Sequence, residues 1–276
     1  MNRTSNRFVR FILVVILTLV AVVAVYPLAY MLLSSMKTSI EFIRNPIAWP
    51  KTFYFDNFQA LYYRFSLLRL FGNTLVSVGG ALILSLVLSV PAAFAFAKLR
   101  FRFKNSLYMT MIGMMTVPGI TFILPNFLLM SRLGWVNHFA SVIVIWGVTS
   151  IPGNVFLLRA LLHSLPNEIL EAVRIDGAGY LQVLLRVVVP LSLPGLATVS
   201  IFNATAWWND LLTPLVYLQS DEMKTMTVAV ATILGRFSSD YPLLLTGLLM
   251  TALPPVLIYI LLQGYIRKGL VIGAIK

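Results

Sequence analysis

Few residues in this chain could do chemistry, and most of them gather in two stretches. The first runs from Leu165 to Gly195, reads LPNEILEAVRIDGAGYLQVLLRVVVPLSLPG, and holds three of the nine acidic residues. The second is NATAWWND, in which Asn203, Trp207 and Asp210 stand at i, i+4 and i+7 and so share one face of a helix. A carboxylate at mid-helix in a membrane costs about 2.5–3.5 kcal/mol on insertion scales, which predicts that Asp210 faces the bundle interior or water.

The sequence holds none of the patterns that mark an enzyme. There is no G-x-x-x-x-G-K-[ST] motif, so the chain is predicted not to bind and hydrolyse ATP through a P-loop. Cysteine is absent, which excludes disulfides and thiolate chemistry, and His138 and His163 stand apart from other metal ligands. No Ser/His/Asp set and no carboxylate pair converges at one membrane depth. We therefore expect a protein that is not an enzyme and that has no metal or cofactor of its own.

The composition is that of an integral membrane protein. Hydrophobic residues make up 59% of the 276 positions and charged residues only 11%, whereas soluble domains carry about 25% charged residues. The net charge of +12 could suggest nucleic acid, but no basic run is interleaved with aromatic residues in a polar setting. The positive-inside bias of membrane proteins explains the charge better.

Six apolar segments are long enough to span a membrane as helices, for which about 20 residues are needed. They are Phe11–Ser34, Gly72–Ala97, Ser106–Met130, Phe139–Leu161, Leu191–Tyr217 and Pro242–Gln263. The first is too long for the apolar core of a signal peptide, so we expect an uncleaved helix. An even number of spans puts both termini on one side of the membrane.

The basic residues predict which side that is. With the termini inside the cell, thirteen of the 21 lysines and arginines are cytoplasmic, and the cluster KLRFRFK follows the second segment in a short loop. The predicted organisation is a cytoplasmic N-terminus (1–10), a first helix (11–34), an external loop (35–71), a five-helix core (72–265) with a cytoplasmic loop at about 162–190, and a cytoplasmic tail (266–276). Aromatic residues of the external loop are expected to anchor it at the membrane interface: Trp49, Tyr54, Tyr62 and Tyr63.

The cytoplasmic loop is predicted to begin with a short amphipathic helix. Pro166 suits the first turn of a helix, and Glu168 and Glu171 then lie near its N-terminus, where negative charge complements the helix dipole. Apolar residues at helical spacing are expected to form one face of this helix: Ile169, Ala172 and Val173.

A turn and a second short helix are predicted to follow. Asp176 and Gly177 form a turn signal, and Gly177 and Gly179 allow positive φ. A helix over Tyr180–Val188 is expected to end at Pro190 and to carry apolar residues on one side: Leu181, Leu184 and Leu185. Such a projection suits a socket on another protein. The alternative is a connector that contacts only lipid headgroups, which three acids disfavour beside an anionic leaflet.

The segment EAVRIDGAGYLQVLLRVVVP resembles the EAA loop of binding-protein-dependent ABC importer permeases. The matching positions are Glu171, Ala172, Asp176, Gly177, Ala178 and Pro190. Val173 stands where the family has a second alanine, and Leu184 stands where phenylalanine is frequent. Further stretches resemble the carbohydrate branch, above all the second permease of maltose-type sugar importers: NTL at Asn73–Leu75, AFAFAKLRFRFK at Ala93–Lys104, WND at Trp208–Asp210 and GLVIGAIK at Gly269–Lys276.

The resemblance implies an all-α, six-span, type I importer permease in the cell (inner or plasma) membrane. It further implies import of a sugar or oligosaccharide, with glycerol-phosphate-type substrates also present in the wider branch. The implied partners are a second homologous permease, two cytoplasmic ATPase subunits that bind the ATP, and an extracytoplasmic solute-binding protein. The matched loop is then the coupling helix that inserts into a groove on the ATPase.

Polar residues within the predicted spans are the candidates for the substrate pathway. Trp207 and Trp208 could stack on a sugar while Asn209 and Asp210 hydrogen-bond to its hydroxyls, although tryptophan is also a membrane-belt anchor and Asn and Asp also join helices. Pro118-Gly119 and Pro152-Gly153 can loosen helices near mid-depth, where transport sites often lie. The remaining candidates are amides: Asn126, Asn154 and Asn203.

Two other classes of membrane protein stay open at this point. A proton-coupled secondary transporter would use Asp210 as its protonation switch, and this leaves the pattern from Glu171 to Pro190 unexplained. A role as a membrane assembly or scaffold protein would explain neither the intramembrane Asp210 nor the pattern from Glu171 to Pro190.

Overall fold

The computed structural model describes residues 3–233 and 240–274, and within these ranges the regular structure is helical, without strands. Residues 1–2, 234–239 and 275–276, which include the ends of both predicted cytoplasmic termini, lie outside the described ranges. The chain divides into two compact units. One comprises residues 1–68 with 229–253, and the other comprises residues 69–228 with 254–276.

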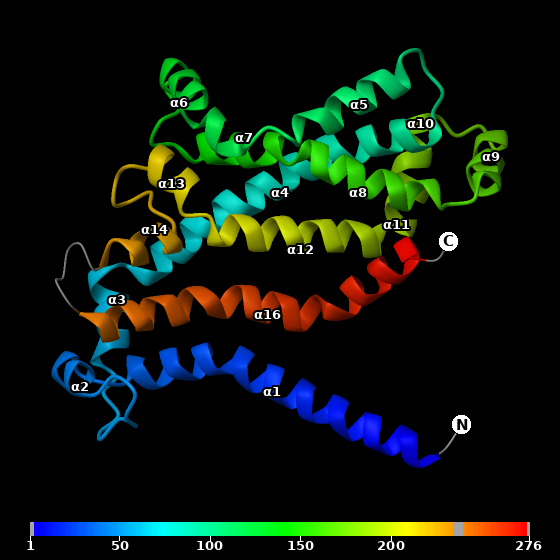
Figure 1. The fold of residues 1–276 in the computed structure, drawn as a ribbon. Coiled ribbons are helices and arrows are strands. Elements are labelled where there is room, and N and C mark those ends of the chain that lie inside the picture. The colour runs from blue at the N-terminus through cyan, green and yellow to red at the C-terminus, as the bar shows by residue number, and fades with distance from the viewer. Residues whose placement is uncertain (1–2, 234–239, 275–276) are drawn as a thin grey trace. The chain divides into compact units, whose positions relative to one another are not determined.

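Three single helices are long and apolar enough to cross a membrane. They are α1 (Arg3–Ser35), α4 (Leu67–Lys98) and α16 (Tyr241–Ala274), drawn in blue, cyan and orange to red in Figure 1. Each contains at least one proline and continues through it. This agrees with the tolerance of membrane helices for proline.

Three further spans are possible if each of three bent helix pairs is counted as one. The pairs are α5 (Lys104–Met114) with the turn η1 (Gly119–Phe122) and α6 (Ile123–Arg132), bent by 89°; α7 (Phe139–Thr149) with α8 (Ile151–His163), bent by 43°; and Tyr180–Leu191 with α12 (Leu193–Asn209), bent by 77°. Five of the six predicted segments thus correspond to the three single helices and to the first two bent pairs. The remaining one, Leu191–Tyr217, overlaps only the second half of the third pair, because Tyr180–Leu191 lies in the predicted cytoplasmic loop.

Proline stands at the start of the second helix in every bent pair. Pro118 precedes η1, Pro152 lies in the first turn of α8, and Pro194 lies in the first turn of α12. Proline has no N–H to donate and disfavours helical φ and ψ in the residue before it, so a helix ends there and a new one begins. The predicted breaks near Pro118 and Pro152 are confirmed.

Two predicted helix ends are wrong. The fifth segment does not continue to Tyr217, because α12 ends at Asn209 and a separate helix, α13 (Leu212–Tyr217), follows the extended residue Asp210. The last helix does not stop near Gln263 but runs on to Ala274 through most of the predicted tail. No proline interrupts the chain after Pro255, which leaves the helix free to extend.

In the first unit, the segment after α1 folds around a buried lysine. It contains the short helices α2 (Ser39–Arg44) and α3 (Asp56–Arg64). Lys37 is only 1% exposed, and its Nζ donates to the carbonyls of Pro46 and Asn45 at 2.9 and 3.4 Å. Asn57 donates its side-chain N–H groups to the carbonyls of Ser35 and Lys37. These bonds hold residues 35–57 in an ordered structure.

The same unit joins this segment to the start of α16. Ser39 donates to the carboxylate of Asp240 at 3.0 Å, and the ring of Phe42 stacks on that of Tyr241. The aromatic residues expected at a membrane interface are solvent-exposed at Trp49, Tyr62 and Tyr63. Their position in the membrane stays a prediction.

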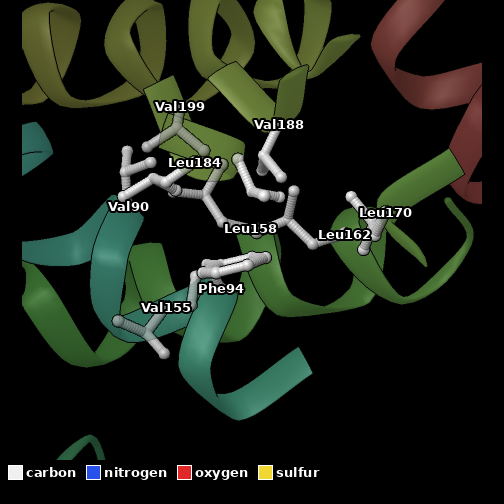
Figure 2. Close-up of a cluster of buried hydrophobic side chains, with 11 residues drawn as sticks. Val90, Phe94, Val155, Leu158, Leu162, Leu170, Leu184, Val188 and Val199 are labelled. Atoms are coloured by element: carbon white, nitrogen blue, oxygen red, sulfur yellow. The ribbon is translucent and has the colours of Figure 1, made fainter. Parts of the chain in front are cut away.

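The second unit is built around two clusters of buried side chains. Figure 2 shows the first cluster, in which residues of six elements converge: Val90, Ala93 and Phe94 of α4, Val155, Leu158 and Leu162 of α8, Leu170 of α9 (Asn167–Ile175), Val183 of α10 (Tyr180–Val183), Leu184 and Val188 of the π-helical turn η2 (Leu184–Val188), and Val199 of α12. The other cluster brings α4, α6, α7, α12 and α13 together. Figure 1 shows α8 lying along α12.

Small residues let α4 and α7 approach closely. A Cβ atom at Gly147 would lie 2.9 Å from the side chain of Leu84, and one at Gly80 would lie 2.7 Å from that of Ile143. The two contacts are reciprocal, because each helix presents a glycine to a leucine or isoleucine of the other. Such small-residue contacts are typical of helix packing in membranes.

The NTL stretch at the start of α4 holds the segment that leads to α14 (Met226–Ala231). Asn73 donates to the carbonyls of Glu222 and Lys224 at 2.7 and 2.9 Å. The hydroxyl of Thr74 accepts the N–H of Met226 at 3.0 Å. The first two residues of this stretch therefore have a structural role.

Candidate functional site

The predicted helix–turn–helix of the cytoplasmic loop is present. Its first helix is α9, preceded by Pro166. The second consists of α10 (Tyr180–Val183), the turn η2 and α11 (Val189–Leu191). Glu168 lies in the first turn of α9, where its charge complements the helix dipole.

The turn between the two helices is a Schellman motif. Asp176 is the C-cap residue that follows α9, and Gly177 comes next with φ of +85°. The N–H of Gly177 donates to the carbonyl of Arg174 at 3.0 Å, and the N–H of Ala178 donates to that of Val173 at 3.2 Å. The Asp-Gly-Ala part of the matched pattern is thus a helix end with glycine in the left-handed region, as the turn signal predicted.

The face of α9 that packs against the spans is not the predicted one. Leu170 is 8% exposed and Val173 packs beside it in the first cluster. Ile169, by contrast, is 42% exposed, and Ala172 is also exposed. The apolar positions of α9 surround it on more than one side, so spacing alone could not tell which side faces the core.

The second helix also differs from expectation. Leu184 is buried as a member of the first cluster, but Leu181 and Leu185 are 68% and 58% exposed. The helix does not end at Pro190 but includes it and stops at Leu191. The preceding π-helical turn shifts the hydrogen-bond register, which accommodates a residue that cannot donate one.

The residues predicted to couple this loop to the ATPase differ in how exposed they are. Glu171, Ala172 and Asp176 are exposed, and Glu171 also lines a cavity of about 490 Å³ between α9, α10 and the end of α4. Ala178 is half-buried against the first cluster, and Pro190 is exposed. Their role in coupling stays a prediction.

A polar network joins α4, the α7–α8 bend and α12. Asn154, 3% exposed, donates to the hydroxyls of Ser85 at 2.6 Å and Ser150 at 3.3 Å. Asn203 donates to the side-chain oxygen of Asn154 at 2.9 Å, and Ser85 and Ser150 lie 2.9 Å apart. Two predicted pathway amides are thus brought together, and they share their hydrogen bonds with two serines that the sequence did not single out.

Asp210 ends α12 and caps α13. Its Oδ2 accepts the indole N–H of Trp146 at 2.8 Å, and its Oδ1 accepts the backbone N–H groups of Leu212 and Thr213 at 2.9 and 3.2 Å. The side chain is half-buried rather than fully exposed. An aspartate that accepts from three donors holds a helix junction together. The mid-helix position predicted for it is wrong.

The two tryptophans of NATAWWND pack inside the unit. Trp207 is 8% exposed and stacks on Trp146 with ring centroids 5.9 Å apart, while Trp208 is 3% exposed and lies edge-on to Phe71. Asn209 is exposed and donates to the Thr205 carbonyl of its own helix. Asn126 lies half-buried on α6 after the bend. The predicted pathway residues thus form three groups: two tryptophans that pack against other rings, two amides in the buried polar network, and two amides, Asn126 and Asn209, that lie apart from it.

The sequence pattern of one membrane-protein family matches most of this chain. The model of the family described as "binding-protein-dependent transport system inner membrane component" covers residues 85–271. This chain belongs to that family. The matched range includes all of α9, the Schellman turn, the polar network and Asp210.

Curated relatives align over nearly the whole length. The chain is 32% identical to the arabinooligosaccharides transport system permease protein AraQ of Halalkalibacterium halodurans over 280 residues, which cover 100% of both chains. It is 31% identical to the melibiose/raffinose/stachyose import permease protein MelC of Bacillus subtilis, over 96% of each chain. It is 27% identical to the diacetylchitobiose uptake system permease protein NgcG of Streptomyces coelicolor, over 95% of this chain and 87% of that one.

The fold matches solved structures of ABC importers. One chain of a bacterial ABC transporter involved in the import of the acidic polysaccharide alginate superposes with a TM-score of 0.81 at 24% identity, covering 96% of this chain and 99% of that one. A chain of the alginate transporter in complex with its pentasaccharide-bound periplasmic protein gives a TM-score of 0.67 at 14% identity. These likenesses establish the type I permease fold.

Membership of this family defines the class of the protein. The chain is a multi-pass inner-membrane permease component of an ABC importer, and it works with a binding protein and the other importer subunits. ATP hydrolysis belongs to a separate subunit, so this chain is not an enzyme.

Sequence reasoning missed several residues that hold the site together. Trp146 lies 64 positions from its partner Asp210, and Ser85 lies 69 positions from Asn154. Ser150 bonds to Asn154 across the α7–α8 bend, and nothing in the local sequence marks any of the three. Lys98 belongs to the basic cluster from which the orientation is predicted. Its place at the end of an apolar segment is the sequence feature that indicates a contact at the end of a helix.

Proposed function

We propose that this permease imports a neutral oligosaccharide and that α9 with the turn at Gly177 docks on a cytoplasmic ATPase subunit. The observation that carries the proposal is the exposure of apolar side chains on a short, tightly capped projection. Ile175 is 85% exposed at the tip of α9, and Leu181 is 68% exposed on α10. Apolar side chains clustered on such a projection are a feature of protein interaction sites.

The inner face of the projection supports the same proposal. Leu170, Val183 and Leu184 pack into the cluster that also contains α4, α8 and α12. A displacement of this projection is therefore passed to α8 and α12, because closely packed interiors transmit strain. ATP binding would close two such ATPase subunits and move this loop, which rocks the spans between inward- and outward-facing arrangements.

A second, homologous permease is part of the proposal. The bend between α5 and α6 leaves residues 115–118 outside any helix, and Met115 and Val117 are 50% and 43% exposed in the single chain. Non-helical backbone at membrane depth is tolerated only where protein covers it or where it lines water. A partner permease or the translocation pathway between the two permeases would provide that cover.

The substrate class rests on the relatives. The three named above are described as permeases for arabinooligosaccharides, for melibiose, raffinose and stachyose, and for diacetylchitobiose. Short uncharged glycosides are common to these descriptions. We propose that amides on α6, α8 and α12 contribute to the pathway, with Trp207 and Trp208 acting through packing: Asn126, Asn154, Asn203 and Asn209.

A proton-coupled transporter is not favoured by the site. Both carboxylate oxygens of Asp210 accept hydrogen bonds that fix a helix junction, and a protonation switch at this position would break the junction in every cycle. The ATP requirement is proposed to lie wholly on the partner ATPase.

Reconstitution tests this proposal. The chain, co-expressed with the permease and ATPase subunits that co-purify with it, is placed in liposomes with its solute-binding protein, and uptake of labelled arabinotriose, raffinose and diacetylchitobiose is measured. We expect uptake of at least one probe to require internal ATP and an active ATPase, and to persist with a proton uncoupler. Uptake that continues without the ATPase and collapses with the uncoupler would overturn the proposal.

A further inference from the structure

The inner side of α9 does not pack on the membrane helices along its whole length. Asn167, Leu170, Glu171 and Arg174 stand at i, i+3, i+4 and i+7, and all four line the cavity of about 490 Å³ whose opposite wall is the end of α4. Leu170 is the one buried residue of α9. Beside such a cavity, the apolar contact alone leaves α9 room to shift without moving α4.

A single ammonium group bridges this gap. Lys98 is the last residue of α4, and its Nζ donates to the carbonyl of Leu165 at 2.6 Å, to Oδ1 of Asn167 at 2.8 Å and to the carbonyl of His163 at 3.4 Å. Its three acceptors span the end of α8, the connecting residues and the first residue of α9. Hydrogen bonds from a charged donor are stronger than neutral ones, and the carbonyl end of a helix attracts a cation.

The helix α8 has its own connection to α4. Arg159 donates from Nε to the carbonyl of Phe96 at 3.2 Å, and its guanidinium lies 4.0 Å from the ring centre of Tyr108 on α5. These contacts hold α8 to α4 and α5 without involving α9. Loss of Lys98 would therefore release α9 specifically and leave the packing between the spans in place.

We propose that Lys98 is a positioning residue that makes the end of the second span follow the movement of α9. The inference rests on the proposed function, in which the ATPase moves α9. With the ammonium in place, the start of α9 and the end of α4 are displaced together. Without it, the same displacement is taken up by the cavity and does not reach α4.

Hydrogen–deuterium exchange in the assembled importer tests this role without knowledge of the substrate. Exchange of residues 90–98 and 167–175 is compared with and without a non-hydrolysable ATP analogue, in the wild-type complex and in Lys98→Met and Lys98→Arg. Lys104→Met is the matched control, because Lys104 also donates to a backbone carbonyl, that of Leu99 at 2.8 Å, but makes none of the three bonds described above.

In the wild type, in Lys98→Arg and in Lys104→Met we expect the nucleotide to change exchange in both segments. In Lys98→Met the change at 167–175 should remain and the change at 90–98 should be lost. A merely structural role would shift the exchange of both nucleotide states equally and leave their difference intact. A nucleotide-dependent change at 90–98 that survives in Lys98→Met would overturn the inference.

Two further results separate this inference from the proposed function. A wild-type complex with no nucleotide-dependent change at 167–175 would overturn docking on the ATPase, and the inference with it. If the Lys98→Met importer fails to assemble, the Asn167→Ala variant provides the test instead. It removes one acceptor of the Lys98 ammonium and leaves the bond to the Leu165 carbonyl. We expect it to reduce the nucleotide effect at 90–98, and an undiminished effect would count against the role of Lys98.

Discussion

Trp146 on α7 donates its indole N–H to Asp210 at the end of α12, 64 positions further along the chain, with the two atoms 2.8 Å apart. The same carboxylate caps α13 through its other oxygen. One side chain thus fixes the angle at which α12 passes into α13 and ties this junction to α7. The aspartate of the WND motif, a predicted pathway residue, therefore has a structural role.

Asp210→Asn should lower the stability of the purified protein by about 1 kcal/mol, because an amide offers one acceptor oxygen where the carboxylate uses two. Trp146→Phe removes the indole donor together with part of the buried ring that stacks on Trp207, so it should cost more than the hydrogen bond alone. A double-mutant cycle, read by thermal unfolding in detergent, should give a coupling energy of about 1 kcal/mol. Strictly additive losses would mean that the two residues do not interact.

The same variants distinguish the two transport mechanisms. ATP-driven uptake by Asp210→Asn should fall only as far as the amount of assembled importer falls. Abolished uptake in a fully assembled Asp210→Asn importer would instead revive a protonation role for this carboxyl.

Gly177→Ala should weaken binding of the ATPase because φ at this position is +85°. A side chain in the left-handed region costs about 1–2 kcal/mol, which corresponds to about a tenfold loss of affinity. No atom lies within 4 Å of the position where the Cβ would be, so the effect would come from backbone strain.

Gly179→Ala is the matched control for that prediction. Gly179 has φ of −72° and also has open space around it. Pull-down of the ATPase with each variant measures the difference. An equal loss of ATPase binding in both variants would show that the left-handed backbone at Gly177 is not required for binding.

Asn154→Leu should destabilise the α4–α8–α12 contact by about 1 kcal/mol, a common value for polar contacts between membrane helices. The substitution leaves Asn203 without its acceptor and Ser85 without its donor. Asn209→Leu is the comparison, since Asn209 is exposed and donates to the Thr205 carbonyl of its own helix. Thermal unfolding of the two variants should differ, and equal midpoints would contradict a stabilising network.

The burial of Lys37 predicts that the stability of the segment formed by residues 35–57 depends on pH. Burial lowers the pKa of its ammonium from the ordinary value of 10.5, and the nearby carboxylate of Glu41 opposes this shift. Between the lowered pKa and 10.5 the unfolded chain holds more protons than the folded chain, so stability rises with pH across that window. At a pH below the lowered pKa, the contribution of Lys37 to the free energy of unfolding is at its lowest. At a pH above 10.5 this contribution no longer changes.

The difference in unfolding temperature between wild type and Lys37→Met should therefore change with pH toward the alkaline side. Lys51→Met, at an exposed lysine of the same segment, should show no such trend. A wild-type advantage that stays flat, or that shrinks as pH rises, would show that Lys37 is not buried in the folded protein.

The sequence predicted the class of the fold and the shape of the coupling loop well, because both depend on local properties. Apolar length identifies the helices, and Pro118, Pro152 and Gly177 act on their own backbone. These features need no knowledge of the partner residue. The fold class was accessible in this way, whereas the importer function and the permease family were implied by the resemblance of the segment Glu171–Pro190 to a family pattern.

The remaining features depend on contacts that local spacing cannot identify. Whether α9 buries Leu170 or Ile169 is decided by α4 and α8, which lie elsewhere in the chain. The partner of Asp210 is likewise distant. A polar residue in a membrane helix is recognisable from the sequence, but the structure decides whether it meets substrate, water or another helix.

The stacked indoles of Trp146 and Trp207 are tilted by only 6° with respect to each other, at a centroid separation of 5.9 Å. At that distance and orientation their excited states couple, and the pair contributes its own signal to the near-ultraviolet circular dichroism. Because one ring belongs to α7 and the other to α12, any movement that separates these helices would weaken the signal. The pair would thus report a movement of α7 against α12 without any added label.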